Sequence, residues 1–119
     1  MLAAAGTTNR SMPANLARQN GAVSAAEREF WRSATCTVRV RHERTGALVF
    51  SGYDRAHLGG YEYLVTVRPE DLPAVRAALG LGPHADMLDA LCAAVEEIMA
   101  VGERSWLCSR GVPCDLQTW

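Results

Sequence analysis

A segment in the middle of the chain places a carboxylate and an imidazole three residues apart. Asp54 and His57 lie between Tyr53 and Tyr61, together with two glycines. A carboxylate beside a histidine is a pair that general acid–base catalysis uses. A short glycine-containing segment between strand-forming residues also predicts a loop that joins antiparallel strands. Because no third catalytic group lies nearby in the sequence, we interpret the segment as a loop and retain Asp54 and His57 only as weak catalytic candidates.

The signatures of the common enzyme and metal-binding classes are missing from the sequence. It has no glycine-rich phosphate loop followed by Lys, no serine nucleophile elbow, no Cys-x-x-Cys and no His-Glu-x-x-His. The histidines and cysteines are scattered along the chain: His42, His57, His84, Cys36, Cys92, Cys108 and Cys114. Zinc would need ligands from distant segments, so we expect no metal and no cofactor. Most thiols lie in apolar segments and are predicted to be buried, with Cys114 the candidate for exposure.

Length and composition are those of one small globular domain. The chain has 119 residues, of which 49% are hydrophobic and 21% charged, and its net charge is −1. Residues 1–68 hold nine arginines and five acidic residues, whereas residues 69–119 hold three arginines and eight acidic residues. A basic half can indicate an acidic partner, but surplus acid on amphipathic helices is also an ordinary solvated surface. The start of the chain has no continuous apolar run, so we expect no signal peptide, no membrane anchor and a cytoplasmic location.

The N-terminal region predicts a tail followed by a helix. Residues 1–22 have no periodic apolar pattern, which predicts a flexible tail before a single domain at 23–119. Ser24 is followed three residues later by Glu27, a capping box that predicts the start of a helix. We therefore expect a short helix over about residues 25–32.

Alternating side chains predict a β-hairpin after this helix. Residues 36–42 alternate in polarity, and Gly46 lies where a three-residue hairpin loop needs a left-handed backbone. The loop pairs Glu43 with Ala47 and fixes the register of both strands. The register assigns to the hairpin an apolar face with Val38, Val40, Leu48 and Phe50, and a polar face with Thr37, Arg39, Arg41, Val49, Ser51 and Tyr53.

The rest of the chain predicts one further strand and two or three helices. Residues 61–67 alternate as a strand, a helix that ends near Gly80 follows, and a longer helix begins near Asp86. Gly102 ends or kinks that helix, and the tail is predicted to be extended, with Trp119 docked on the domain. The sequence thus predicts an α+β fold: a three-stranded antiparallel meander with a short N-terminal helix and two to three C-terminal helices packed on one face.

The polar face of the hairpin is the principal candidate for a binding site. Arg39, Arg41, Tyr53 and Thr37, with Arg55 from the adjoining loop, could contact carboxylates or phosphates, although the face could equally be a solvated surface. Arg and Tyr are enriched at protein interfaces, whereas the slightly acidic chain makes nucleic acid a less favoured partner. We therefore predict a small protein-binding or accessory module, regulatory or immunity-type, whose open face could also support a homo-oligomer.

A second interpretation places the function between the sheet and the helices. Here His42, Tyr61, Tyr63 and Trp106 would line the pocket of a small enzyme or a small-ligand-binding protein. A concave pocket with converging polar groups would favour this interpretation. A filled core and a flat exposed sheet would favour the binding module.

Overall fold

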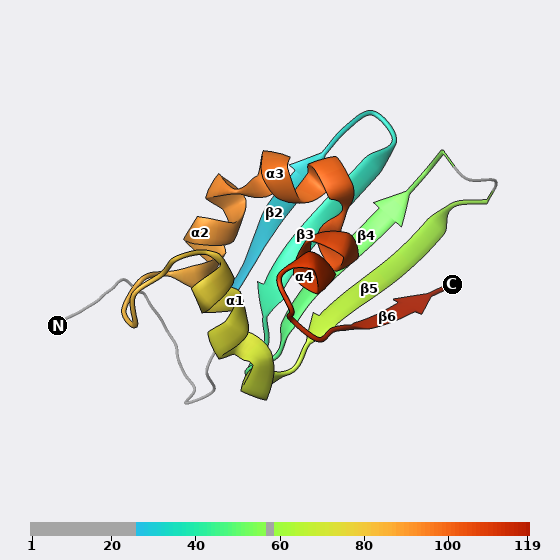
Figure 1. Ribbon diagram of the computed structural model, residues 1–119. Helices are drawn as coiled ribbons and strands as arrows, with labels where there is room; N and C mark the ends of the chain where they lie inside the picture. The colour runs from blue at the N-terminus through green and yellow to red at the C-terminus, as the bar shows by residue number, and fades with distance from the viewer. Residues whose placement is uncertain (1–25, 57–58) are drawn as a thin grey trace, which may run out of the picture.

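A computed structural model describes residues 26–56 and 59–119 of the protein. The predicted tail at 1–22 and Ser24 of the predicted capping box lie outside these residues. Strands and helices follow one another along the described chain as shown in Figure 1. They are β2 (Ala26–Arg32), β3 (Cys36–His42), β4 (Leu48–Asp54), β5 (Tyr61–Val67), the 3₁₀ turn η1 (Pro69–Asp71), α1 (Leu72–Ala78), α2 (Met87–Ala93), α3 (Val95–Val101), α4 (Glu103–Ser109) and β6 (Asp115–Thr118).

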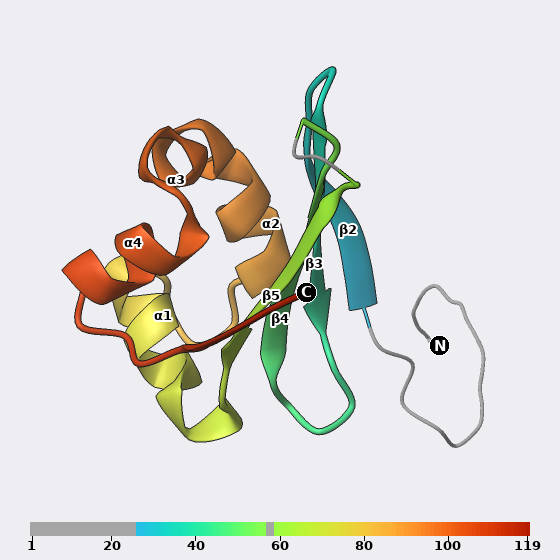
Figure 2. The same cartoon turned by 90° about the vertical axis from the view of Figure 1, so that its right-hand side faces the viewer.

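The strands form one antiparallel sheet in which each strand pairs with its neighbours in sequence. The order is β2-β3-β4-β5-β6. All four α-helices lie on one side of this sheet, and no element of the described chain covers the other side (Figure 2). The predicted α+β class with an antiparallel sheet is therefore confirmed. The prediction of three strands is wrong, because the sheet has five.

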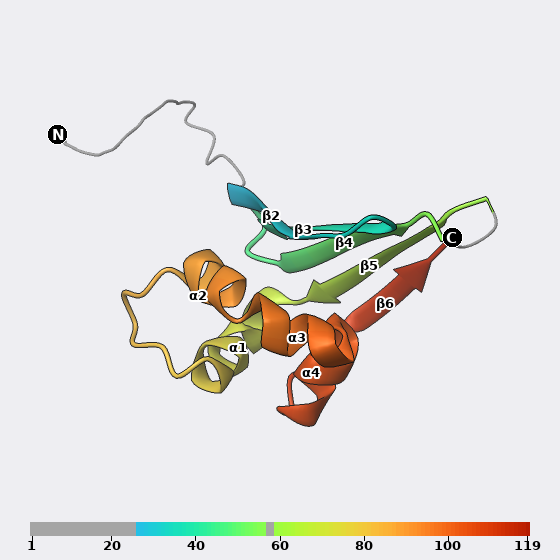
Figure 3. The ribbon, with the colours of Figure 1, turned by 90° about the horizontal axis from the view of Figure 1, so that it is seen from above.

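The predicted N-terminal helix is wrong as well, because the described residues 26–32 form the edge strand β2 (Figure 3). Glu27 and Glu29 pair directly with Arg41 and Arg39 of β3. A β-bulge follows Glu29, and Phe30 is buried in the core. Pairing with residues distant in the sequence thus outweighs the local signal for a helix start.

The predicted register of the hairpin between β3 and β4 is confirmed. The N–H of Glu43 donates to the carbonyl of Ala47 at 2.8 Å, and the N–H of Gly46 donates to the carbonyl of Glu43 at 2.8 Å. Gly46 has a φ of 96°, the left-handed conformation that the three-residue loop requires. With this loop closed, Val40 lies opposite Phe50 as expected.

The core lies between the helices and the apolar face of the sheet. Phe50 is fully buried, and its ring packs edge-on against Phe30 with 5.3 Å between the ring centroids. Leu91 of α2 and Ile98 of α3 are fully buried in the same core cluster. Helix α2 packs against β2 and β3, and α3 packs against β2. The predicted packing of the C-terminal helices on one face of the sheet is confirmed.

The long helix predicted from Asp86 is divided at Ala94. Asp86 caps the start of α2, where its Oδ1 accepts the N–H of Asp89 at 2.9 Å. The N–H of Ala94 is shared between the carbonyls of Ala90 and Leu91 at 3.1 Å each, which tightens the last turn and ends α2. Gly102, with a φ of 93°, separates α3 from α4. The helical layer therefore consists of short helices of seven residues each.

The extended C-terminal segment adds strand β6 to the sheet. Beyond β6, the N–H and the carbonyl of Trp119 each bond to Glu62 at 3.0 Å. The Trp119 side chain is nevertheless 65% exposed. The predicted docking of this indole is therefore wrong: the backbone of the residue is fixed, and the register directs its side chain away from the helices.

Candidate functional site

The side of the sheet opposite the helices, called the open face below, is built from alternate residues of the strands. Strand pairing aligns them in rows that cross the sheet. Each row takes one residue from β2, β3, β4 and β5 and one from the C-terminal segment. The first row is Arg32, Thr37, Tyr53, Glu62 and Trp119. The second is Glu29, Arg39, Ser51, Leu64 and Gln117, and the third is Glu27, Arg41, Val49, Thr66 and Asp115. The predicted polar face of the hairpin forms the centre of this surface.

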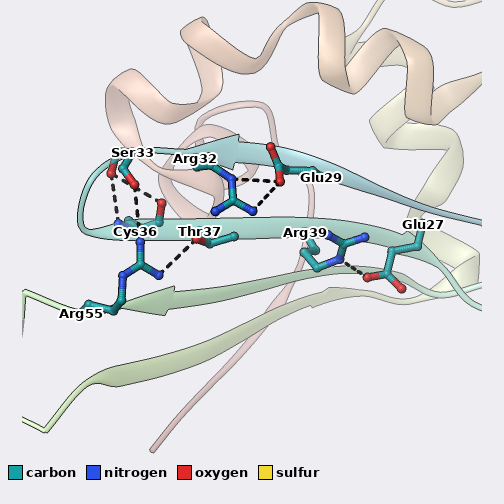
Figure 4. Close-up of polar contacts among 8 residues, drawn as sticks. All are labelled: Glu27, Glu29, Arg32, Ser33, Cys36, Thr37, Arg39 and Arg55. Atoms are coloured by element: carbon teal, nitrogen blue, oxygen red, sulfur yellow. Dashed lines mark hydrogen bonds and ion pairs between the residues drawn. The ribbon is translucent and has the colours of Figure 1, made fainter.

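Arg39 has hydrogen-bonding capacity left for a partner. Its Nε donates to Glu27 on β2, and no residue in the described ranges accepts from its two terminal nitrogens (Figure 4). The side chain is 47% exposed. A guanidinium binds a carboxylate most strongly through two parallel N–H groups. Glu27 therefore orients Arg39 and leaves its outer amino groups accessible.

Arg41, two residues further along β3, is occupied by its own chain. Its Nε and Nη2 both donate to Oε2 of Glu43, at 3.2 and 2.8 Å. Both side chains of this pair are about one-third exposed, at 34% and 32%. Arg41 is therefore less accessible to a partner than Arg39, although the two share a strand, a face and a charge.

Arg55 connects the loop after β4 to the turn between β2 and β3. Its Nη1 donates to Oγ1 of Thr37 at 3.2 Å (Figure 4). Its Nη2 donates to the carbonyls of Ser33 and Ala34 at 3.4 Å. The guanidinium also lies 5.9 Å from the centroid of the Tyr53 ring, within the range of a cation–π contact. Tyr53 is 38% exposed. Arg55 thus contacts the exposed aromatic ring of Tyr53.

Of the candidate catalytic pair, the structure describes Asp54 alone. Oδ1 of Asp54 accepts the N–H of Ala56 at 2.9 Å, a bond by which aspartate side chains shape turns. His57 lies outside the described residues. The local hydrogen bond of Asp54 agrees with the interpretation of this segment as a loop.

The residues of the alternative pocket lie in different places. His42 lines a cavity of about 180 Å³. Trp106 lines a separate groove of about 380 Å³ between the helices. Tyr61 and Tyr63 lie side by side on β5, with 6.1 Å between their ring centroids, and line neither space.

Each of these two spaces is lined by a polar side chain that bonds within the protein. In the first, Nη2 of Arg76 donates to the carbonyls of Gly82 and Ala85 at 2.6 Å each. In the second, Nε1 of Trp106 donates to Oε2 of Glu97 at 3.1 Å. The first cavity is also smaller than the roughly 300–1,000 Å³ typical of small-ligand pockets.

Tyr63 and Glu103 form a buried pair that was not predicted from the sequence. The phenol of Tyr63 donates to Oε2 of Glu103 at 2.6 Å, and Glu103 is only 5% exposed. Burial, and then the hydrogen bond to Glu103, raise the pKa of Tyr63 far above its ordinary value. The pair connects β5 to the first turn of α4. Its members are 40 residues apart, so no spacing in the sequence indicates the contact.

The Tyr63–Glu103 pair predicts a steep loss of stability at high pH. In the unfolded chain the phenol releases its proton near pH 10, whereas the folded protein retains it. This contribution is therefore complete below pH 10, and above pH 10 the free energy of unfolding falls by about 1.4 kcal/mol per pH unit. Tyr63→Phe should remove that part of the slope and cost about 2 kcal/mol at pH 7, because the buried carboxylate loses its donor.

Denaturant unfolding of both proteins between pH 7 and 11 measures this difference. The control is Tyr53→Phe, which removes an exposed phenol and should leave the alkaline slope close to that of wild type. Equal alkaline slopes for wild type and Tyr63→Phe would contradict the assignment.

The thiols differ in exposure from the prediction. Cys108 is exposed, whereas Cys36, Cys92 and Cys114 are partly buried. Burial raises the pKa of the thiols of Cys36 and Cys114. The expectation that Cys114 is the exposed thiol is wrong, because the turn after α4 packs Cys114 against the core and leaves Cys108 on the surface.

Comparisons with known proteins return no relative for this chain: no family model, no curated protein and no solved structure matches it. Within residues 26–56 and 59–119, no helix has the length and apolar character needed to cross a membrane. The same residues contain no group of three or more His, Cys, Asp or Glu side chains placed to hold a metal ion. The function is therefore inferred from the geometry of the open face.

Proposed function

We propose that this protein is a small protein-binding or accessory module, regulatory or immunity-type, that binds its partner through the open face. One observation carries the proposal: Arg39 and Tyr53 lie exposed on the sheet face that the helices leave uncovered, and Arg39 has terminal N–H groups that no described residue occupies. Arg and Tyr are the residue types that most often dominate the binding energy of protein interfaces.

The contacts around these two residues favour a protein partner that presents a carboxylate next to an apolar group. The oriented guanidinium of Arg39 suits a bidentate carboxylate, and the ring of Tyr53 offers a rigid apolar surface. The charges of neighbouring strands alternate, with Glu27, Glu29 and Arg32 around them. Such a mixed surface lacks the dense positive charge with which proteins bind a nucleic-acid backbone.

A photo-crosslinking amino acid placed at position 53 tests the proposal in cells that make the protein. We expect one dominant crosslinked partner from position 53. The matched control carries the crosslinker at Val101, which is 58% exposed on α3, away from the open face. The same products from both positions would contradict the proposal.

The two arginines of β3 provide a sharper comparison within the same crosslinking experiment. Arg39→Gln should lower the yield of the partner crosslink by about tenfold or more, because a charge-assisted contact is lost. Arg41→Gln removes the same charge from the same face, but its guanidinium is held by Glu43, so the yield should change little. Both variants should keep the melting temperature of wild type within a few degrees, because exposed ion pairs contribute about 0–1 kcal/mol. Equal losses in both variants would show that general charge, and not Arg39, determines binding.

A further inference from the structure

The two edges of the sheet are protected to very different degrees. At the β2 edge, four of the seven residues are charged, and a β-bulge interrupts the strand. Charges and bulges are the devices that prevent a foreign strand from pairing with an exposed edge. At the β6 edge, Asp115 is the charged residue, whereas Leu116 is 42% and Trp119 65% exposed. Figure 1 shows β6 as the outermost strand on its side of the sheet.

The register of β6 determines which backbone groups point outward. Glu62 and Trp119 exchange both of their backbone hydrogen bonds, at 3.0 Å each. Hydrogen-bonded pairs alternate with non-bonded pairs along antiparallel strands, so Gln117 and Asp115 also point their backbone groups toward β5. The N–H and carbonyl groups of Leu116 and Thr118 therefore point away from the sheet. They form a row of donors and acceptors on which another strand can pair.

Two acidic side chains beside the β6 edge form no ion pair with an arginine of the described residues, unlike the acidic side chains near β2. The carboxylates of Glu27, Glu29 and Glu43 are paired with arginines. Glu62 and Asp115 lie exposed on the open face beside the β6 edge, and no arginine within the described ranges forms an ion pair with either. A strand that added to this edge would therefore meet two unpaired negative charges on the open-face side. On the other side it would meet the apolar side chain of Leu116.

We propose that the outer edge of β6 binds an extended peptide segment of a partner protein, which adds a further antiparallel strand and carries basic side chains on the open-face side. Opposite Asp115, a Lys would form an ion pair. Opposite Trp119, an Arg would lie over the indole and approach Glu62. β-branched residues would lie opposite Leu116 and Thr118. This site is separate from Arg39 and Tyr53, so it does not depend on binding at the centre of the open face.

A synthetic peptide with the sequence Arg-Val-Thr-Val-Lys tests the proposal on the ¹⁵N-labelled chain of 119 residues. In the proposed register its first residue lies opposite Trp119 and its last opposite Asp115. We expect saturable chemical-shift changes at the amides of Leu116 and Thr118 and at their neighbours on β5. A peptide with Glu in place of both basic residues should bind about tenfold more weakly or worse.

N-methylation of the peptide separates strand addition from charge attraction. The second and fourth residues would donate their N–H groups to Thr118 and Leu116, so methylation of either nitrogen should weaken binding by about tenfold or more. The N–H of the third residue points away from β6, and its methylation should be tolerated. Equal binding of all the methylated peptides would overturn the proposal, as would the absence of saturable shifts.

Variants of the protein test the charge contribution. Asp115→Asn should lower the affinity for the basic peptide severalfold. Glu96→Gln, an equal change of charge at an exposed position on α3, should leave that affinity unchanged. Equal effects of both variants would overturn the assigned role of Asp115. Concentration-dependent shifts of Leu116 and Thr118 without peptide would overturn the proposal in favour of pairing between two copies of this chain.

Discussion

Replacing Phe50 by Ala should destabilise the protein by about 3–5 kcal/mol. Phe50 is fully buried on β4 and packs edge-on against Phe30 of β2, so truncation leaves a cavity and removes an aromatic contact. Denaturant unfolding at pH 7 measures the change. Because domains of this size have total stabilities of about 5–15 kcal/mol, the variant should be close to its unfolding threshold.

An exposed truncation provides the control for this prediction. Val101→Ala removes an apolar side chain that is 58% exposed near the end of α3 and should change the free energy of unfolding by no more than about 0.5 kcal/mol. An unchanged midpoint for Phe50→Ala would show that the face of β4 assigned to the core is wrong.

Replacing Gly52 by Ala should cost about 3 kcal/mol or more. Gly52 is buried between Val38 and Tyr63 in adjacent strands, and a Cβ atom there would overlap the ring of Tyr63. The ring has little freedom to move, because its hydroxyl is bonded to the buried carboxylate of Glu103. Relief of the overlap would therefore break the hydrogen bond that connects β5 to α4.

A double-mutant cycle isolates this overlap. In a Tyr63→Ala background, Gly52→Ala should cost less than about 1 kcal/mol, since the ring that it meets is absent. Gly82→Ala is the matched control, because a Cβ atom at Gly82 would have no heavy atom within 4 Å other than those of its own residue and its two chain neighbours. Additive effects of the substitutions at positions 52 and 63 would contradict the packing described here.

The hairpin between β3 and β4 could be predicted because its determinants lie close together in the sequence. Gly46 defines the loop, and the alternation on either side of it defines the faces. Strand β2 could not be predicted in the same way. The apparent capping box of Ser24 and Glu27 predicts a helix at this point of the sequence. The arginines with which Glu27 and Glu29 pair lie 10 or more residues later in the chain.

The candidate site shows the same division between local and distant determinants. The hairpin register predicted that four of the candidate residues share one face, and the structure confirms that location. They are Thr37, Arg39, Arg41 and Tyr53. The difference between Arg39 and Arg41 could not be predicted, because the acid that orients Arg39 lies on a strand that was expected to be a helix. The Tyr63–Glu103 pair was missed because tertiary packing alone brings the two residues together.

The short length of the helices has a consequence for how the protein folds. Each α-helix has seven residues, well below the roughly 12–15 residues at which isolated helices become even marginally stable in water. Helical structure must therefore gain its stability from the sheet beneath it. Strands β2 to β5 of this sheet follow one another through short connections, whereas the segment with all four α-helices separates β5 from β6. Such local pairing favours rapid formation of the meander. We therefore expect the helices to form on that surface and to be lost together with it.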